Sequence, residues 1–262
     1  MINDNYLTLD GKINFKTNHI DILTDLEKAE IQLINSFLVG NFVSGLATGR
    51  LIIRGDLKNP SANAELVCEN IIINDFHVKS IDFNSRLEVN EDSTLGYIEL
   101  KTEEGNWKGM HFENGMISAS LQNDHITVEN FNFKSGNDFI QFTGFYNGKD
   151  NYRIDRLQLA YKDNYLINTS PISFFYSDSN LNIDPFELHI NDGVLEGYVY
   201  GEESPEGQFK MSNFDAKILT SFFIDNKFKV SGLIFGEVWI KPLEEKLDLD
   251  IDNMIYDISN VM

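Results

Sequence analysis

The chain has 262 residues, with 41 acidic against 21 basic side chains, a formal net charge of −20 and a pI near 4.5. This length fits one large all-β domain or two smaller domains. The negative charge argues against nucleic acid as a partner, because phosphates would be repelled. Cys68 is the only cysteine, so neither an intrachain disulfide nor a thiolate metal site can form.

The N-terminal residues carry no basic n-region and no apolar h-region, so no secretion signal is predicted. The longest apolar runs have a few residues, far short of the ~20 that a membrane-spanning helix needs, and we expect no membrane-spanning segment. Tyr6 to Lys16 predicts strand, turn and strand with no cap ahead of it. We therefore expect an internal fragment of a longer protein.

Two short helices are predicted, near residues 24–38 and 213–224. Thr24 and Glu27 have the spacing of a capping box, and Gly40 is a suitable stop. Apolar residues recur at helical spacing in the first segment, namely Leu26, Ala29, Leu33 and Phe37. Ser212 or Asn213 would cap the second helix.

An eleven-residue segment follows each predicted helix. VSGLATGRLII over Val43–Ile53 returns as VSGLIFGEVWI over Val230–Ile240, a shift of 230 − 43 = 187 residues. Repeat units would thus start near residues 24 and 213, with strand motifs over 43–60 and 230–240. A unit that recurs in this way predicts a fold built by iteration. We find no linker and expect a single elongated unit over residues 1–262.

The remaining sequence alternates between apolar and polar residues with a period of two. Turns such as Asn-Asp and Asn-Asp-Gly between the alternating runs predict antiparallel hairpins, with one apolar face and one wet face. Two helices cannot cover about 20 strands, which at ~4.8 Å spacing would extend on the order of 100 Å. The apolar face then needs a second sheet, closure into a barrel, or a sheet that curls into a trough. Iterated units favour the curled sheet over a simple sandwich.

Gly45 to Pro60 resembles a signature of a known family. The segment GLATGRLIIRGDLKNP is similar to the Gly-x-x-x-Gly-x-Leu-x-Ile-x-Gly-Asp-Leu-x-Asn-Pro motif of the TamB-like branch of the AsmA superfamily, the translocation-and-assembly-module proteins of bacterial envelopes. The motif positions are Gly45, Gly49, Gly55, Asp56, Asn59 and Pro60, with Gly232 and Gly236 in the second copy. Residues 33–75 match the motif well. The second copy has Lys241-Pro242-Leu243 where Gly-Asp-Leu-x-Asn-Pro would stand.

The resemblance implies an elongated, curled antiparallel β-sheet that forms a hydrophobic groove (a β-taco), without catalytic residues, cofactor or metal. It also implies a periplasmic location, with the full-length protein anchored in the inner membrane by a segment absent here. The implied activity is to carry phospholipid acyl chains between inner and outer membrane. At about 0.8 kcal/mol per methylene, a fully buried chain of ~16 carbons would gain roughly 10 kcal/mol or more.

Apolar positions of the alternating runs are the predicted lining of this groove. They are Leu51, Ile53, Leu66, Ile71, Ile73, Phe76, Val78, Ile81, Phe83, Leu87, Ile126, Val128, Phe131, Phe133, Leu157, Leu159, Phe186, Leu188, Val238 and Ile240.

Two alternative functions stay open. One is a structural or interaction module that helps to assemble outer-membrane β-barrels, possible partners of its exposed sheet edges. The other is a carbohydrate-active β-solenoid, which predicts a coil repeat of roughly 20–30 residues that the sequence does not show. Asp248, Asp250 and Asp252 alternate with apolar residues as on the wet face of a strand. The five histidines are far apart in sequence, and no pair of glutamates stands out as catalytic.

Overall fold

The computed structural model describes residues 6–32, 43–107, 110–162, 164–177, 180–201, 206–215, 232–242 and 247–256. These residues form antiparallel strands, with one short 3₁₀ turn and no α-helix among them, which confirms the all-β class. The chain divides into an N-terminal unit, Met1–Gly136, and a C-terminal unit, Asn137–Met262. One elongated domain over residues 1–262 stays a prediction.

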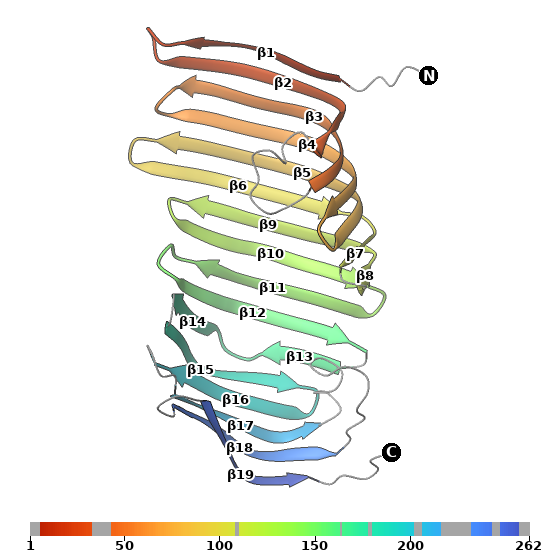
Figure 1. Ribbon diagram of the computed structural model, residues 1–262, viewed down its shortest axis with the longest axis vertical. Coiled ribbons are helices and arrows are strands. Elements are labelled where there is room, and N and C mark those ends of the chain that lie inside the picture. The colour runs from red at the N-terminus through yellow and green to blue at the C-terminus, as the bar shows by residue number, and fades with distance from the viewer. Residues whose placement is uncertain are drawn as a thin grey trace. The chain divides into compact units, whose positions relative to one another are not determined.

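The described strands of the N-terminal unit form one antiparallel sheet (Figure 1, red to green). They are β1 (Tyr6–Asn14), β2 (His19–Glu30), β3 (Val43–Asp56), β4 (Pro60–Ile73), β5 (Phe76–Asn90), β6 (Ser93–Thr102), β7 (Gly105–Trp107), β8 (Met110–Phe112), β9 (Asn114–Gln122) and β10 (His125–Ser135). Strands β1 to β6 pair in chain order, β6 pairs with β9, and β9 pairs with β10. The short strand β7 pairs with β5 on one side and β8 on the other.

The C-terminal unit is built in the same way. Its strands are β11 (Asp138–Tyr146), β12 (Asn151–Tyr161), β13 (Asn164–Asn168), β14 (Ile172–Ser177), β15 (Asn180–Ile190), β16 (Gly193–Tyr200), β17 (Glu206–Asp215), β18 (Leu233–Pro242) and β19 (Leu247–Tyr256). One end of β12 pairs with β13 and the other with β14, and both of these pair with β15. From β15 to β19 each strand pairs with the next.

The first predicted helix is wrong where the structure describes it, because residues 24–30 belong to strand β2. The register of β2 against β3 shifts between Leu26 and Ala29, and Lys28 has a φ of 50°. This bulge inserts one residue, so two side chains of the same face stand three positions apart, as they would on a helix. Residues 33–38 of that prediction lie outside the described residues.

The second predicted helix is wrong over residues 213–215, the part of it that the structure describes, for the same reason. Asn213 to Asp215 are the last residues of β17, and Asn213 has a φ of 50° within a register shift between Met211 and Phe214. Neither Ser212 nor Asn213 is therefore a helix cap. Residues 216–224 lie outside the described residues. In both copies of the repeat, a bulged strand precedes the segment that begins Val-Ser-Gly-Leu.

Tyr6 to Asn14 is one strand and does not contain the predicted turn. The Asp10-Gly11 dipeptide is a common turn sequence, but Gly11 serves a close approach between strands. A Cβ atom at Gly11 would lie 2.7 Å from the carbonyl oxygen of Asp21 in β2. The predicted hairpins are confirmed elsewhere: Asn74 and Asn191 turn between paired strands with φ of 52°, a conformation that asparagine tolerates.

Candidate functional site

At the paired positions that the structure describes up to Ile240, each unit has one face without charged side chains. Directly opposed residues of antiparallel strands project to the same face, so the strand registers assign every paired residue to a face. In the N-terminal unit one face, here called the apolar face, contains no Asp, Glu, Lys, Arg or His at any paired position. The opposite, polar face holds all the charged residues of those pairs.

The register places every predicted lining residue of the N-terminal unit on its apolar face. These residues are Leu51, Ile53, Leu66, Ile71, Ile73, Phe76, Val78, Ile81, Phe83, Leu87, Ile126, Val128, Phe131 and Phe133. The pairs Leu66–Phe83 and Ile71–Val78 illustrate the arrangement, since each joins two predicted residues across neighbouring strands.

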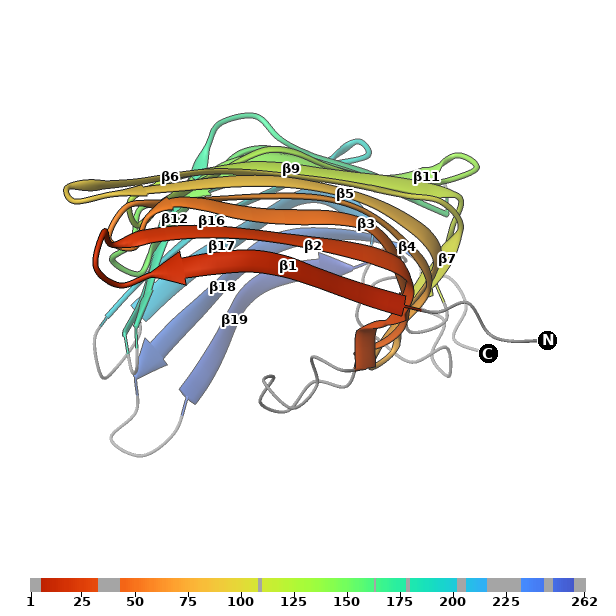
Figure 2. The ribbon, with the colours of Figure 1, turned by 90° about the horizontal axis from the view of Figure 1, so that it is seen from above.

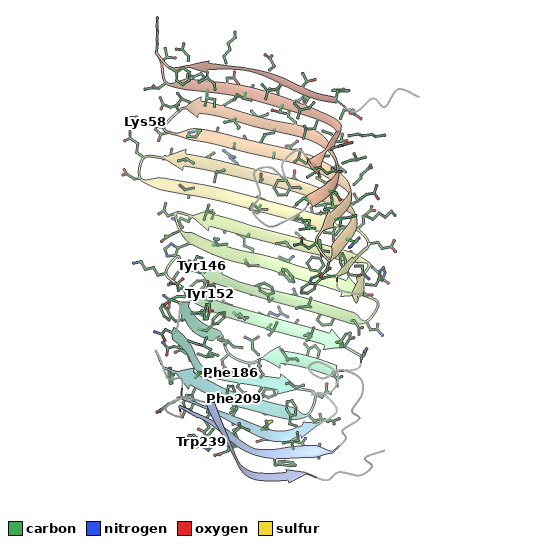
Figure 3. The ribbon with its side chains drawn as sticks, viewed as in Figure 1. Lys58, Tyr146, Tyr152, Phe186, Phe209 and Trp239 are labelled. Carbon is green, nitrogen blue, oxygen red and sulfur yellow. The ribbon has the colours of Figure 1, made fainter. Side chains whose placement is uncertain are left out.

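In the C-terminal unit the predicted lining residues also share one face. This face has no charged side chain at the paired positions of β11 to β17, or of β18 up to Ile240. They are Leu157, Leu159, Phe186, Leu188, Val238 and Ile240. Ring contacts link strands on this face, between the neighbours β11 and β12 and, across Gly197 of β16, between β15 and β17. Phe186 and Phe209 have centroids 6.2 Å apart, and Tyr146 and Tyr152 have centroids 4.9 Å apart (Figure 3).

One end of the N-terminal apolar face is closely packed. Its buried cluster consists of Ile71, Val78, Ile81 and Phe112, with Phe76, Phe83 and Phe133 against it. The Phe112 ring stacks on Phe76 at 5.6 Å and meets Phe133 edge to face at 5.2 Å. At this end β4 has a register shift opposite Ser44 and Leu46, with Asn70 at a φ of 54°. Because bulges bend strands, the strands curve here, as Figure 2 shows for β4 and β7.

The other part of the same face is open. Leu87, Ile98 and Ile126 are 38%, 46% and 41% exposed although they project from the apolar face. The described strands of this unit belong to one sheet, and none of them forms a second layer over these side chains. Along β5 and β10 the face therefore changes from a packed corner to an exposed apolar surface.

Three of the motif glycines have backbone conformations that other residues rarely adopt. Gly45 and Gly49 have φ of 138° and 142°, a region that essentially only glycine occupies. A Cβ at Gly45 would lie 2.6 Å from Ile71 Cδ1, and one at Gly49 would collide with the carbonyl oxygen of Glu65. Gly232, the counterpart of Gly45, has the same conformation with φ of 133°. Gly236 lies opposite Met211, next to the bulge of β17.

The rest of the motif shapes the β3–β4 turn. Gly55 has a φ of 123°. The Asp56 carboxylate accepts a hydrogen bond from Lys58 N at 2.9 Å. The backbone carbonyl oxygen of Asp56 accepts another from Asn59 N at 3.0 Å. Pro60 begins β4 opposite Gly55. These contacts give the motif a structural role at the hairpin end of the sheet.

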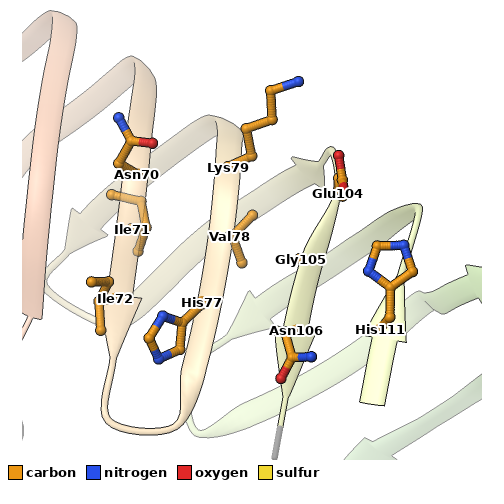
Figure 4. Close-up of a pocket in the computed structure, with 10 residues that line it drawn as sticks. All are labelled: Asn70, Ile71, Ile72, His77, Val78, Lys79, Glu104, Gly105, Asn106 and His111. Atoms are coloured by element: carbon orange, nitrogen blue, oxygen red, sulfur yellow. The ribbon is translucent and has the colours of Figure 1, made fainter. Parts of the chain in front are cut away.

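A hollow of about 440 Å³ lies at the packed end of the N-terminal unit (Figure 4). His77 and His111 stand on the polar face on either side of Asn106, which pairs with both. The Lys79 ammonium lies 3.8 Å from the Glu103 carboxylate. No group of three or more His, Cys, Asp or Glu side chains within the described ranges has the geometry to hold a metal ion.

Cross-strand ion pairs order the polar face. Arg50 pairs with Asp25 and Arg54 with Asp21, both at 2.7 Å between β3 and β2. A hydrogen bond from Lys101 lowers the pKa of the Glu99 carboxyl. On the apolar face, burial raises the pKa of the Cys68 thiol. The titratable chemistry of the N-terminal unit is thus concentrated on the face opposite the open apolar surface.

No family model, curated protein or solved structure matches this chain. The resemblance to TamB-like proteins therefore stays a prediction. No helix in the described part of the chain has the length and apolarity to cross a membrane.

The apolar faces include residues that the sequence did not single out. Examples are Ile98 and Leu100 of β6 and Leu195 and Phe209 of the C-terminal unit. In β6 the alternation is obscured because Leu95 and Tyr97, on the polar face, are also apolar or aromatic. The Glu99–Lys101 pair marks the parity of this strand and could have identified it.

Proposed function

We propose that this chain is a non-enzymatic segment of a bacterial envelope protein that shelters phospholipid acyl chains on its apolar faces. In this proposal the curved faces form a groove, and lipid moves along it between inner and outer membrane. The observation that carries the proposal is an open, charge-free apolar surface on a single-layered sheet. A soluble protein rarely leaves such a surface to water without a ligand or partner.

The energetics favour an acyl chain as the ligand. Removing a methylene from water stabilises by about 0.8 kcal/mol. A chain of ~16 carbons that is half covered by an open face would therefore gain roughly 6 kcal/mol. This gain is large enough for binding and small enough for release.

The lining also suits movement along the sheet. Apolar pairs such as Leu51–Ala64, Leu66–Phe83 and Leu100–Ile117 continue from strand to strand. No charged side chain interrupts the paired positions of the face. A bound chain would meet similar surface at successive strands, so no single position would trap it.

Lipid uptake by the purified chain tests the proposal. The chain, free of detergent, is mixed with vesicles that contain a fluorescent phospholipid, and bound lipid is measured after separation and by native mass spectrometry. Leu87→Asp places a carboxylate on the open apolar face and should reduce uptake by about tenfold or more, because burying an unpaired charge is costly.

Leu95→Asp is the matched control. Leu95 is 44% exposed, close to the 38% of Leu87, but it stands on the polar face, opposite Glu88. Uptake by Leu95→Asp should equal that of the unmodified chain. Absence of bound lipid and of uptake in the unmodified chain would contradict the proposal, as would equal losses in both variants.

A further inference from the structure

A hollow of about 350 Å³ lies on the polar face of the C-terminal unit. It lies beside a bulge of β15, where the register against β16 shifts between Ile183 and Phe186 and leaves Tyr198 opposite the bulge. Three neighbouring strands supply its polar side chains, which are Glu187 of β15, Glu196 and Tyr198 of β16, and Gln208 and Lys210 of β17.

The walls of the hollow are rich in hydrogen-bond acceptors. Glu187 and Glu196 stand directly opposite each other, an arrangement that by itself destabilises a sheet. The hydrogen bonds of the Glu187 carboxylate use Oε1 alone, and the Gln208 amide donates through Nε2 to Glu237 at 3.1 Å. Among the described residues, no donor bonds Glu187 Oε2, either carboxylate oxygen of Glu196, or Gln208 Oε1. A ligand with several donor groups would satisfy these oxygens.

The hollow also has an aromatic wall. Tyr198 and Tyr200 lie on the polar face opposite Gln208 and Glu206, with ring centroids 5.4 Å apart and planes inclined by 31°. Tyr200 is 42% exposed. A tyrosine ring offers a flat apolar surface with a polar tip, so the C–H groups of a ligand can pack on it while its polar groups stay hydrogen-bonded.

The charges around the hollow disfavour an anion. Two carboxylates, of Glu187 and Glu196, line it together with one ammonium group, that of Lys210, which lies 3.8 Å from Glu196. The whole chain carries a net charge of −20. A phosphate or a carboxylate ligand would therefore be repelled, whereas an uncharged ligand that donates hydrogen bonds would not.

We propose that this hollow binds an uncharged sugar ring. The hydroxyl groups of the sugar donate to Glu187, Glu196 and Gln208, and the C–H face of the ring packs on Tyr198. Hydrogen bonds to a carboxylate are stronger than those between neutral groups. With neighbouring strands ~4.8 Å apart, β15 to β17 present a patch roughly 10 Å wide, which accommodates a short oligosaccharide. The site goes beyond the proposed lipid function and does not depend on it, because it lies on the opposite face of the sheet.

Calorimetric titration of the full chain tests the site. The probes are uncharged oligosaccharides of glucose, in α- and in β-linkage, and of N-acetylglucosamine, with a galacturonic acid oligomer and spermidine for comparison. At least one uncharged oligosaccharide should bind with a dissociation constant of about 1 mM or lower. The galacturonate oligomer should bind about tenfold or more weakly, because its carboxylates meet those of the hollow.

Two substitutions in the hollow should weaken sugar binding. Tyr198→Ala removes the ring and should raise the dissociation constant by about tenfold, whereas Tyr198→Phe keeps the ring and should leave it within about twofold. Glu196→Ala removes an acceptor and should also raise the dissociation constant by about tenfold. The fold tolerates this change, since it also relieves the facing like charges.

Tyr97→Ala is the matched control. Tyr97 is 38% exposed on the polar face of the N-terminal unit, and its hydroxyl donates to the Glu99 carboxylate at 3.0 Å, but it does not line the hollow. Sugar binding by Tyr97→Ala should equal that of the unmodified chain. Circular dichroism establishes that each variant is folded.

Four results would overturn the proposal. They are no binding of any uncharged oligosaccharide, equal affinities of Tyr198→Ala and Tyr97→Ala, galacturonate binding as tight as that of the uncharged sugars, and binding of spermidine alone, which would assign the hollow to cations. Lipid uptake by Tyr198→Ala should equal that of the unmodified chain, so the outcome for the sugar is separate from the outcome for the lipid.

Discussion

Replacing Gly49 by alanine should strongly destabilise the N-terminal unit. Gly49 has a φ of 142°, and an added Cβ would collide with the carbonyl oxygen of Glu65 and lie 2.9 Å from Leu66 Cα. A residue forced into such a backbone region costs about 1–3 kcal/mol. The collision with backbone atoms of β4 adds to this, because β4 must move while it is paired on both sides. We expect a total loss of about 3 kcal/mol or more.

Urea denaturation followed by circular dichroism measures the loss. Gly136→Ala is the matched control, since Gly136 also has a positive φ, of 57°, but a Cβ there would meet nothing within 4 Å. The control should lose about 1 kcal/mol, the cost of a left-handed alanine. If Gly49→Ala lost no more stability than Gly136→Ala, the assignment of the motif glycines to close strand approach would be refuted.

Three other predictions concern single side chains. Asn168 is buried and bridges β12 by accepting from Leu157 N and donating to the carbonyl oxygen of Asp155; Asn168→Ala should cost about 2–4 kcal/mol in urea denaturation. The hydrogen bond with His189 lowers the pKa of the Glu187 carboxyl in the folded protein. The ionised carboxylate therefore stabilises the fold above the unfolded-state pKa, and this stabilisation is lost as pH falls through the folded-state pKa. Glu187→Gln should therefore make the free energy of unfolding depend less on pH in the acid range. Because burial raises the Cys68 pKa, its alkylation at pH 8 should be slower than that of a free thiol and slower still with lipid bound. Equal alkylation rates for Cys68 and a free thiol, an unchanged acid limb, or an Asn168→Ala variant of full stability would count against these assignments.

The apolar face could be predicted from sequence because the alternation of side chains between the two faces is set within each strand. In β5, Ile81, Phe83 and Leu87 alternate with Asp82, Asn84 and Glu88, and side chains two residues apart share a face. Short turns between the strands then keep the apolar residues of successive strands on the same face of the sheet.

The bulges could not be predicted, because they depend on the neighbouring strand. Lys28 and Asn213 each insert one residue, and the resulting three-residue spacing is indistinguishable from one helical turn in the sequence alone. The packed corner around Phe112 was also missed. Phe112 ends the three-residue strand β8, which is too short to show any alternation.

Photo-crosslinking to lipid tests the central claim most directly. A photoreactive leucine analogue placed at Leu87, on the apolar face, or at Leu95, on the polar face, is activated while the chain is mixed with phospholipid vesicles. The proposal predicts acyl-chain adducts at position 87 and few or none at position 95, as read by mass spectrometry. Adducts at both positions in equal yield, or at neither, would contradict a role of the apolar face in holding acyl chains.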